Sequence, residues 1–196
     1  VPGMEEEHEH EGEDENEGEE AEYDEHVWTS PKNAILIAKA ISDKLCEIDP
    51  DNKNEYVKNT EAYTAELNVL DEIFKKVTIN ASRNTIVMGD RFPFRYLADE
   101  YGLNYFAAFP GCATDAEPSA STIAFLIGKV KAENIPVVFH MEFSNQKVSK
   151  SICEATGAQP LELHSCHNIT ADEFKNGVTY IDIMRRNANN LEIALK

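Results

Sequence analysis

The sequence lacks the short motifs that mark several common families of enzymes and nucleotide-binding proteins. No HExxH, GxGxxG or GxxxxGK run occurs in its 196 residues, so neither a zinc-protease motif nor a dinucleotide- or phosphate-binding loop is present. No run of 18 or more apolar residues occurs either, and we therefore expect no membrane-spanning helix. The first residues do not resemble a signal peptide. Because Val1-Pro2-Gly3 leads at once into acidic sequence, we expect further sequence upstream.

Basic residues are scarce, and the negative charge is concentrated in one segment. The formal net charge is -18, and residues 5–25 contribute 14 of the 36 acidic residues and no Lys or Arg. Without those 14 carboxylates the charge of -18 falls to -4. Phosphate binding needs concentrated basic charge, so this composition argues against nucleic acid as a partner.

The acidic segment, residues 1–22, is of low complexity and contains His8 and His10. It holds too few apolar residues to fold alone, so we predict a solvated, disordered loop. A weak metal-collecting role for its two histidines is the alternative. Four cysteines without any CxxC pair do not form a disulfide scaffold; they are Cys46, Cys112, Cys153 and Cys166.

Two helices are predicted after the acidic segment. Ser30-Pro31 places an N-capping serine before a proline at the first helical position, and Asp49-Pro50 repeats this arrangement. Apolar residues follow at intervals of three and four. The second helix is predicted over residues 50–78, about 40 Å at ~1.5 Å per residue. This length suggests a connector, so we assign residues 23–80 to a unit of connecting helices.

Strands and helices alternate four times in residues 81–196. This alternation is typical of an α/β fold, a parallel four-stranded sheet with helices on both faces, preceded here by a long connector helix. A Thr170/Glu173 capping box starts the last helix, which is predicted to run to the C-terminus. The strands are predicted at 85–89, 103–109, 136–140 and 160–164, and the helices that follow the first three at about 92–101, 118–133 and 144–157.

Residues that bind metals gather at the predicted strand ends. Ligands of open parallel sheets bind beyond the carboxyl ends of the strands, and imidazole together with carboxylate suits Zn²⁺ or Mn²⁺. A single histidine at such a place can equally cap a helix or bond to a carbonyl. A metal-dependent hydrolase using His164, His167 and Glu142 is a further alternative. The residues concerned are Asp90, His140, Glu142, His164, Cys166 and His167, with His26 just before the first helix.

The run "YDEHVWTSPKNA", residues 23–34, resembles the metal-ligand motif of the zinc- and manganese-binding solute-binding proteins of ABC importers. The matching positions are Asp24, His26, Trp28, Ser30 and Pro31. In that family the Asp-x-His-x-Trp-x-Ser-Pro run also follows a His-rich acidic loop. The resemblance covers residues 23–196 and includes the segments 94–103, 116–122, 139–158 and 180–195.

The resemblance implies a non-enzymatic protein with two α/β lobes joined by a long helix and a metal ion held between them. Such a protein captures Zn²⁺ or Mn²⁺ and delivers it to the permease of an ABC importer, either at the cell surface on an upstream lipid anchor or in the periplasm. The present chain would be the C-terminal half, without the N-terminal lobe. A surface adhesion domain of the same fold is an alternative, and its main support is a departure from the family pattern at Arg91.

The resemblance carries the family's ligands over unevenly. His26 matches directly, and His164 falls where the family has an aspartate ligand. The family's third ligand, a histidine five residues before the helical Tyr96, falls on Arg91, and a guanidinium cannot ligate. Asp90 is the replacement if the strand end shifts by one residue; otherwise His167, Cys166 or His140 completes the shell. Alternatively, Arg91 forms a structural ion pair with Glu142 or Asp90. The additional histidines and a nearby thiol favour zinc over manganese.

Overall fold

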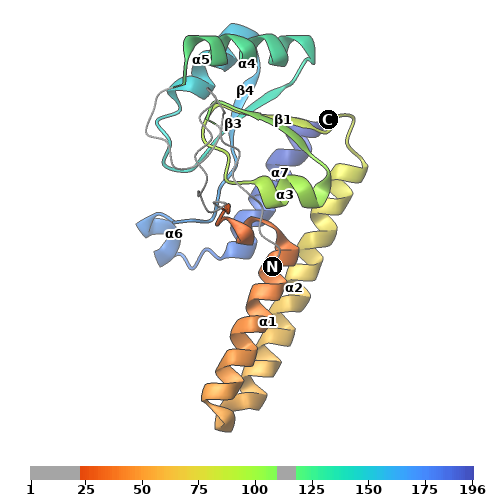
Figure 1. Ribbon diagram of the computed structural model, residues 1–196, viewed down its shortest axis with the longest axis vertical. Helices are drawn as coiled ribbons and strands as arrows, with labels where there is room; N and C mark the ends of the chain where they lie inside the picture. Colours follow the sequence, from red (N-terminus) through yellow and green to blue (C-terminus); the bar gives the residue numbers. More distant parts are fainter. Residues whose placement is uncertain (1–22, 110–117) are drawn as a thin grey trace, which may run out of the picture.

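The computed structural model describes residues 23–109 and 118–196, which form a helical hairpin followed by a sheet covered by helices (Figure 1). The predicted acidic loop with His8 and His10 lies outside the described residues, as does Cys112. The elements in chain order are α1 (Pro31–Ile48), α2 (Lys53–Ile79), β1 (Thr85–Met88), α3 (Arg95–Tyr101), β2 (Asn104–Ala107), α4 (Ala120–Ala132), β3 (Val137–His140), α5 (Lys147–Thr156), β4 (Gln159–Glu162), α6 (Ala171–Lys175) and α7 (Tyr180–Leu195).

The helical hairpin forms where the sequence predicts it. The Ser30 side chain accepts a hydrogen bond from Asn33 N at the start of α1, with proline at the first helical position. The second helix begins at Lys53 rather than at residue 50, because Pro50–Asn52 form a 3₁₀ turn first. The C-terminal half of α2 packs against the lobe, whereas its first half and α1 extend away from the sheet (Figure 1).

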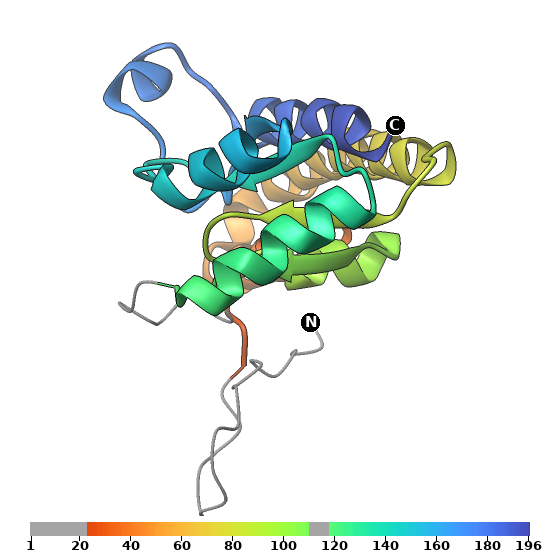
Figure 2. The ribbon, with the colours of Figure 1, turned by 90° about the horizontal axis from the view of Figure 1, so that it is seen from above.

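The four strands form one parallel sheet in the order β2-β1-β3-β4, which confirms the predicted fold class. Successive strand residues point to opposite faces, so the sheet separates two hydrophobic clusters. One cluster contains Met88 and Phe139 with residues of α2, α3 and α7. The other contains Val87 and Val138 with residues of α4 and α5. Figure 2 shows α4 and α5 on one side of the strands and α2 and α7 on the other.

The last predicted helix is in fact two helices. The Thr170/Glu173 capping box is present, but it starts only the five-residue α6. Gly177 then adopts φ 68, a left-handed conformation that ends a helix. A second capping box, Thr179/Asp182, starts α7. The prediction of one continuous helix is therefore wrong, because the glycine and the second N-cap interrupt it.

Close packing at Gly89 fixes the carboxyl edge of the sheet. A Cβ atom at Gly89 would lie 2.5 Å from Ser149 Cα, so only glycine lets the first part of α5 approach the end of β1 this closely. Gly89 N also donates to Phe139 O at 2.8 Å, which ties the end of β1 to β3. Within the two described ranges, no helix has both the length and the apolar character required to cross a bilayer.

Candidate metal centre

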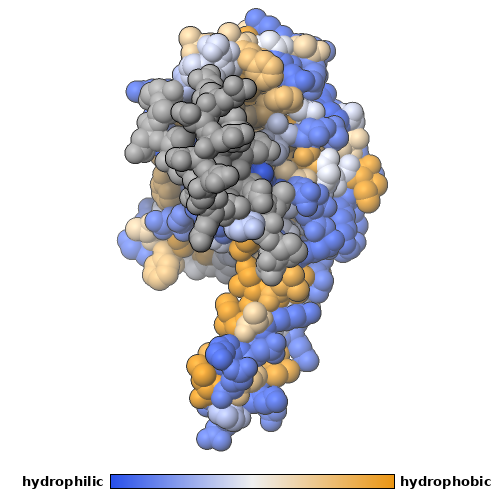
Figure 3. All heavy atoms as spheres, in the orientation of Figure 1, coloured by the Kyte–Doolittle hydropathy of each residue, from blue (hydrophilic) through white to orange (hydrophobic). Residues whose placement is uncertain are grey.

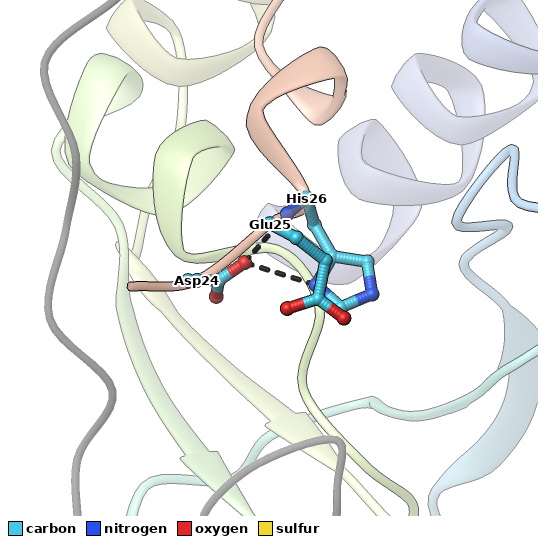
Figure 4. A group of neighbouring side chains, drawn as sticks. All are labelled: Asp24, Glu25 and His26. Atoms are coloured by element: carbon cyan, nitrogen blue, oxygen red, sulfur yellow. Dashed lines mark hydrogen bonds and ion pairs between the residues drawn. The ribbon is translucent and has the colours of Figure 1, made fainter. Parts of the chain in front are cut away.

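His26 and Asp24 form the best-defined polar pair at the carboxyl edge of the sheet (Figure 4). The His26 side chain is 4% exposed and that of Asp24 3% exposed. Asp24 Oδ1 accepts the His26 backbone N–H at 2.8 Å and lies 2.9 Å from His26 Nδ1. Since a carboxylate only accepts, Nδ1 carries a proton. In the neutral ring Nε2 then has the lone pair that a metal ion requires.

Three separate elements hold the segment around His26 in place. Tyr96 Oη, on α3, donates to the Asp24 carbonyl at 2.9 Å. Trp28 Nε1 donates to the Ser165 carbonyl at 2.9 Å, and Tyr180 Oη, on α7, donates to the Trp28 carbonyl at 2.7 Å. Burial raises the pKa of the Tyr180 hydroxyl well above its ordinary value, so it remains a donor at neutral pH. His26 is therefore positioned by hydrogen bonds as well as by local sequence.

His167 lies beside His26 although 141 positions separate them in the sequence. The centroids of the two imidazole rings are 6.1 Å apart, and the His167 ring meets that of Trp28 edge to face at 6.0 Å. His167 is solvent-exposed, so its ring is accessible to an incoming ion. Imidazole nitrogens suit a nitrogen-preferring ion, although the close group of ligand atoms found among the described residues contains His26 but not His167. Among the candidate ligands predicted from the sequence and lying in the described ranges, His167 has a ring contact with His26.

His164 is buried and its Nδ1 atom is engaged with the backbone. Cys166 N donates to His164 Nδ1 at 2.9 Å, so this nitrogen acts as an acceptor and the neutral ring carries its proton on Nε2. Asn187 binds the main chain of His164 through two hydrogen bonds. Its Oδ1 atom accepts from His164 N at 2.9 Å, and its Nδ2 atom donates to His164 O at 2.8 Å. To bind a metal through Nε2, His164 would have to exchange the Cys166 hydrogen bond for a proton on Nδ1.

Asp90 connects two strand ends. Its Oδ1 atom accepts from Arg91 N at 3.0 Å and its Oδ2 atom from Met141 N at 3.4 Å, so the two carboxylate oxygens bond to backbone donors that follow β1 and β3. His140 Nδ1 lies 3.0 Å from the Met141 carbonyl. Neither side chain belongs to the close group of ligand atoms found among the described residues, which consists of Asp24, Glu25 and His26.

Glu142 is a buried carboxylate bound by a single neighbour. Its Oε2 atom accepts Ser165 N at 2.8 Å, and its Oε1 atom accepts the Ser165 hydroxyl. His164 Nδ1 lies 3.8 Å from Glu142 Oε2. In a hydrolase the general base must reach a metal-bound water, whereas here both Glu142 oxygens hold the loop after β4.

Cys166 is a poor nucleophile in this structure. Burial, aided by the negative charge of Glu142, raises the pKa of the thiol to about 12, so it is protonated at neutral pH. Its backbone is left-handed, with φ 62. In this turn Cys166 N donates to His164 Nδ1, and the next residue, His167, has its ring beside that of His26.

Sequence reasoning missed the contributions of Asp24, Glu25 and Ser165. Asp24 was part of the motif but was not expected to orient the imidazole; its position two residues before His26 was the available signal. Glu25 offers a carboxylate oxygen within 4.8 Å of ligand atoms of its two neighbours. Ser165 had no signal of its own, because its partners Trp28 and Glu142 are remote in sequence.

The fold is that of an α/β lobe of the solute-binding type, preceded by a helical hairpin and with candidate metal ligands near the carboxyl edge of its sheet. The chain belongs to the ZnuA family, described as the periplasmic component A of a zinc-uptake complex, whose sequence model matches residues 1–194. It is 37% identical over 195 residues to the high-affinity zinc uptake system protein ZnuA of Bacillus subtilis. That alignment covers 100% of this chain and 60% of the relative.

Solved structures show the same fold. The metal-dependent lipoprotein YcdH of Bacillus subtilis matches with a TM-score of 0.78 and 33% identity, over 89% of this chain and 65% of that chain. The Zn(II)-bound ZnuA-like domain of Streptococcus pneumoniae AdcA matches with a TM-score of 0.75 and 32% identity, over 88% of this chain and 64% of that chain. The chain thus spans less than two thirds of the length of each of these proteins.

Proposed function

We propose that the protein captures Zn²⁺ and delivers it to the permease of an ABC importer, and that it is not an enzyme. The observation that carries this proposal is the buried Asp24–His26 pair with the His167 ring 6.1 Å from that of His26. A carboxylate that orients a histidine is a recurrent support of zinc sites. Membership of a zinc-uptake family and the zinc-bound state of the AdcA domain support zinc as the cargo.

In the proposed site, His26 binds through Nε2 while Asp24 retains the proton on Nδ1. His167 supplies the second imidazole. His164 and Asp90 remain further candidate ligands. To bind the ion, His164 would first have to lose its hydrogen bond from Cys166 N. Asp90 would have to lose its hydrogen bond from Arg91 N or from Met141 N. This lobe alone then offers two well-placed nitrogens, whereas a closed zinc site has four ligands.

We also propose that a second lobe completes the coordination shell and covers the helical hairpin. Figure 3 shows apolar side chains on the part of the molecule that extends away from the sheet. Exposed apolar patches of this kind mark interaction surfaces. Relatives that are longer than this chain, such as the Bacillus subtilis zinc-uptake protein, have room for such a lobe. The exposed apolar residues of the hairpin include Leu36, Ile41, Ile48, Val57 and Val69.

The names of the relatives support a location outside the cytoplasm. The family description includes the word periplasmic, and YcdH is called a lipoprotein. We propose a periplasmic or lipid-anchored surface location, with the anchor upstream of Val1. Manganese as cargo and surface adhesion remain predictions. Hydrolysis is not favoured, because Glu142 is occupied by Ser165 and the Cys166 thiol is protonated.

Zinc titration of the two-lobed protein tests the proposal. His26→Ala should abolish tight binding, and His167→Ala should weaken it, as measured by competition with a chromogenic chelator. His140→Ala is the matched control, since it removes another buried strand-end histidine whose Nδ1 atom faces the Met141 carbonyl. Unchanged zinc affinity in the His26→Ala, His167→Ala double variant would refute the ligand assignment. Manganese outcompeting zinc at equal concentration would refute the choice of cargo.

A further inference from the structure

Ser165 connects three parts of the chain at the metal-binding edge. It is fully buried, with 0% exposure, in the loop after β4. Its N–H and hydroxyl both donate to Glu142, which follows β3. Its hydroxyl oxygen accepts His167 N at 3.2 Å, and its carbonyl accepts Trp28 Nε1 at 2.9 Å. All the polar atoms of one small residue are therefore used to fix neighbours of the proposed zinc site.

The two groups held by Ser165 are the two that flank His26. The Trp28 ring centroid lies 5.4 Å from that of His26, and the His167 ring centroid lies 6.1 Å from it. Trp28 and His167 also contact each other edge to face at 6.0 Å. A displacement of Ser165 would therefore move both rings relative to His26.

Glu142 in turn fixes Ser165. Its side chain is 6% exposed, and a carboxylate this buried requires hydrogen bonds to offset its desolvation. The two Glu142 oxygens accept from Ser165 N and from Ser165 Oγ, and together these bonds define both the position and the rotation of Ser165. Removing either partner would leave buried polar groups unsatisfied and lower the stability, so a test of the geometric role has to measure stability separately.

We propose that Glu142 and Ser165 are positioning residues for zinc capture: Glu142 fixes Ser165, which holds Trp28 and His167 around His26. This proposal rests on the zinc-capture function proposed above. It adds two residues that do not themselves bind the ion, and it assigns Glu142 the role of a hydrogen-bond acceptor rather than of a ligand or base.

Three substitutions and one control test the proposal in the two-lobed protein. Ser165→Ala and Glu142→Ala should each weaken zinc binding by roughly 10- to 100-fold, the loss typical when a group supporting a ligand is removed. Glu142→Gln should bind zinc nearly as the wild type does, because the amide can still accept from Ser165 N and donate to Ser165 Oγ. Ser149→Ala is the control: it truncates another serine with 0% exposure, whose hydroxyl donates within α5 to Gln146 O.

A second measurement separates positioning from general destabilisation. Trp28 is the only tryptophan in these 196 residues, so acrylamide quenching of its fluorescence reports this site once any tryptophan of the second lobe has been replaced by phenylalanine. In the metal-free protein, Ser165→Ala and Glu142→Ala should increase the quenching constant of Trp28. Glu142→Gln and Ser149→Ala should leave it at the wild-type value, even where they lower the melting temperature.

The outcomes distinguish the two proposals. If the wild-type protein fails to bind zinc, both proposals are overturned. If the wild type binds zinc and the Ser165→Ala and Glu142→Ala variants bind it equally tightly, only the positioning role is refuted. Equal losses in Glu142→Gln and Glu142→Ala would also refute it, because the negative charge rather than the hydrogen bonding of Glu142 would then matter.

Discussion

The Asp24 carboxylate should strongly influence zinc affinity although, in the proposed site, it does not itself bind the ion. Asp24 Oδ1 makes two contacts with His26, at 2.8 Å to its backbone N and 2.9 Å to Nδ1. Without the carboxylate, the imidazole loses both its orientation and the partner that keeps the proton on Nδ1. Losing such support typically weakens metal binding roughly 10- to 100-fold, or about 1.4–2.7 kcal/mol.

The fold will also be affected, and the experiment has to separate the two effects. Asp24→Ala leaves buried donors of His26 without their acceptor, which costs about 1–3 kcal/mol of folding stability. Asp24→Asn keeps an acceptor oxygen but not the charge. Zinc affinity should therefore fall in the order wild type, Asp24→Asn, Asp24→Ala. Chelator competition measures the affinity, and calorimetry with and without zinc measures the melting temperature.

Asp71 provides the matched control. It is a carboxylate with 5% exposure on α2, and it accepts from Tyr101 Oη at 2.9 Å and pairs with Lys75 Nζ at 2.7 Å. Asp71→Ala should lower the melting temperature while leaving zinc affinity unchanged. Wild-type affinity in Asp24→Ala, or an equal loss of affinity in Asp71→Ala, would refute the reasoning.

Three further predictions follow from local features of the lobe. Gly89→Ala should destabilise the protein by about 1–3 kcal/mol through overpacking. Gly128 lies in a helix with open space around it, so Gly128→Ala should stabilise the protein by roughly 0.5–1 kcal/mol. Urea denaturation measures both free energies of unfolding, and equal effects of the two substitutions would contradict the close packing at Gly89. Hydrogen bonds from Arg186, the largest contribution, and from Thr170 lower the pKa of Glu173 to about 2 from its ordinary value of 4.5. The resulting stabilisation of the folded state is present above pH 4.5 and is lost as the pH falls toward 2. The melting temperature of Arg186→Ala should therefore decline less between pH 4.5 and pH 2 than that of the wild type. An equal decline in the two proteins would show that the Arg186–Glu173 pair does not stabilise the fold. With its pKa raised to about 12, the Cys166 thiol should resist iodoacetamide at pH 8; rapid alkylation found by peptide mapping would show that it is not buried as described.

Much of the fold could be predicted from the sequence because its signals are local. Ser30-Pro31 and the Thr170/Glu173 capping box specify helix starts through hydrogen bonds within four residues. The apolar strands and their spacing specified a parallel sheet. The break before α7 was missed because Gly177 was not weighed as a helix end and Thr179 was not considered as a second N-cap.

The candidate site was less predictable because its geometry depends on contacts between distant residues. The motif identified His26, and the strand ends supplied a set of possible partners. Only the structure shows the left-handed turn at Cys166, whose N–H bonds to Nδ1 of His164 and beyond which the His167 ring lies beside that of His26. Sequence spacing contains no information about such a turn, since a non-glycine residue adopts it only in a suitable tertiary context.

The sequence by itself determined most of the elements, the parallel sheet, the family and the histidine that we propose as the central ligand. These depend on periodicity, capping and a contiguous motif, all of which act over a few residues. Only the tertiary structure decided which side chains meet at His26. The Trp28–Ser165 hydrogen bond joins residues 137 positions apart, and it forms because the packing of the sheet brings the loop after β4 beside the entry to α1. The convergence of groups at a binding site is a property of that packing rather than of any local pattern.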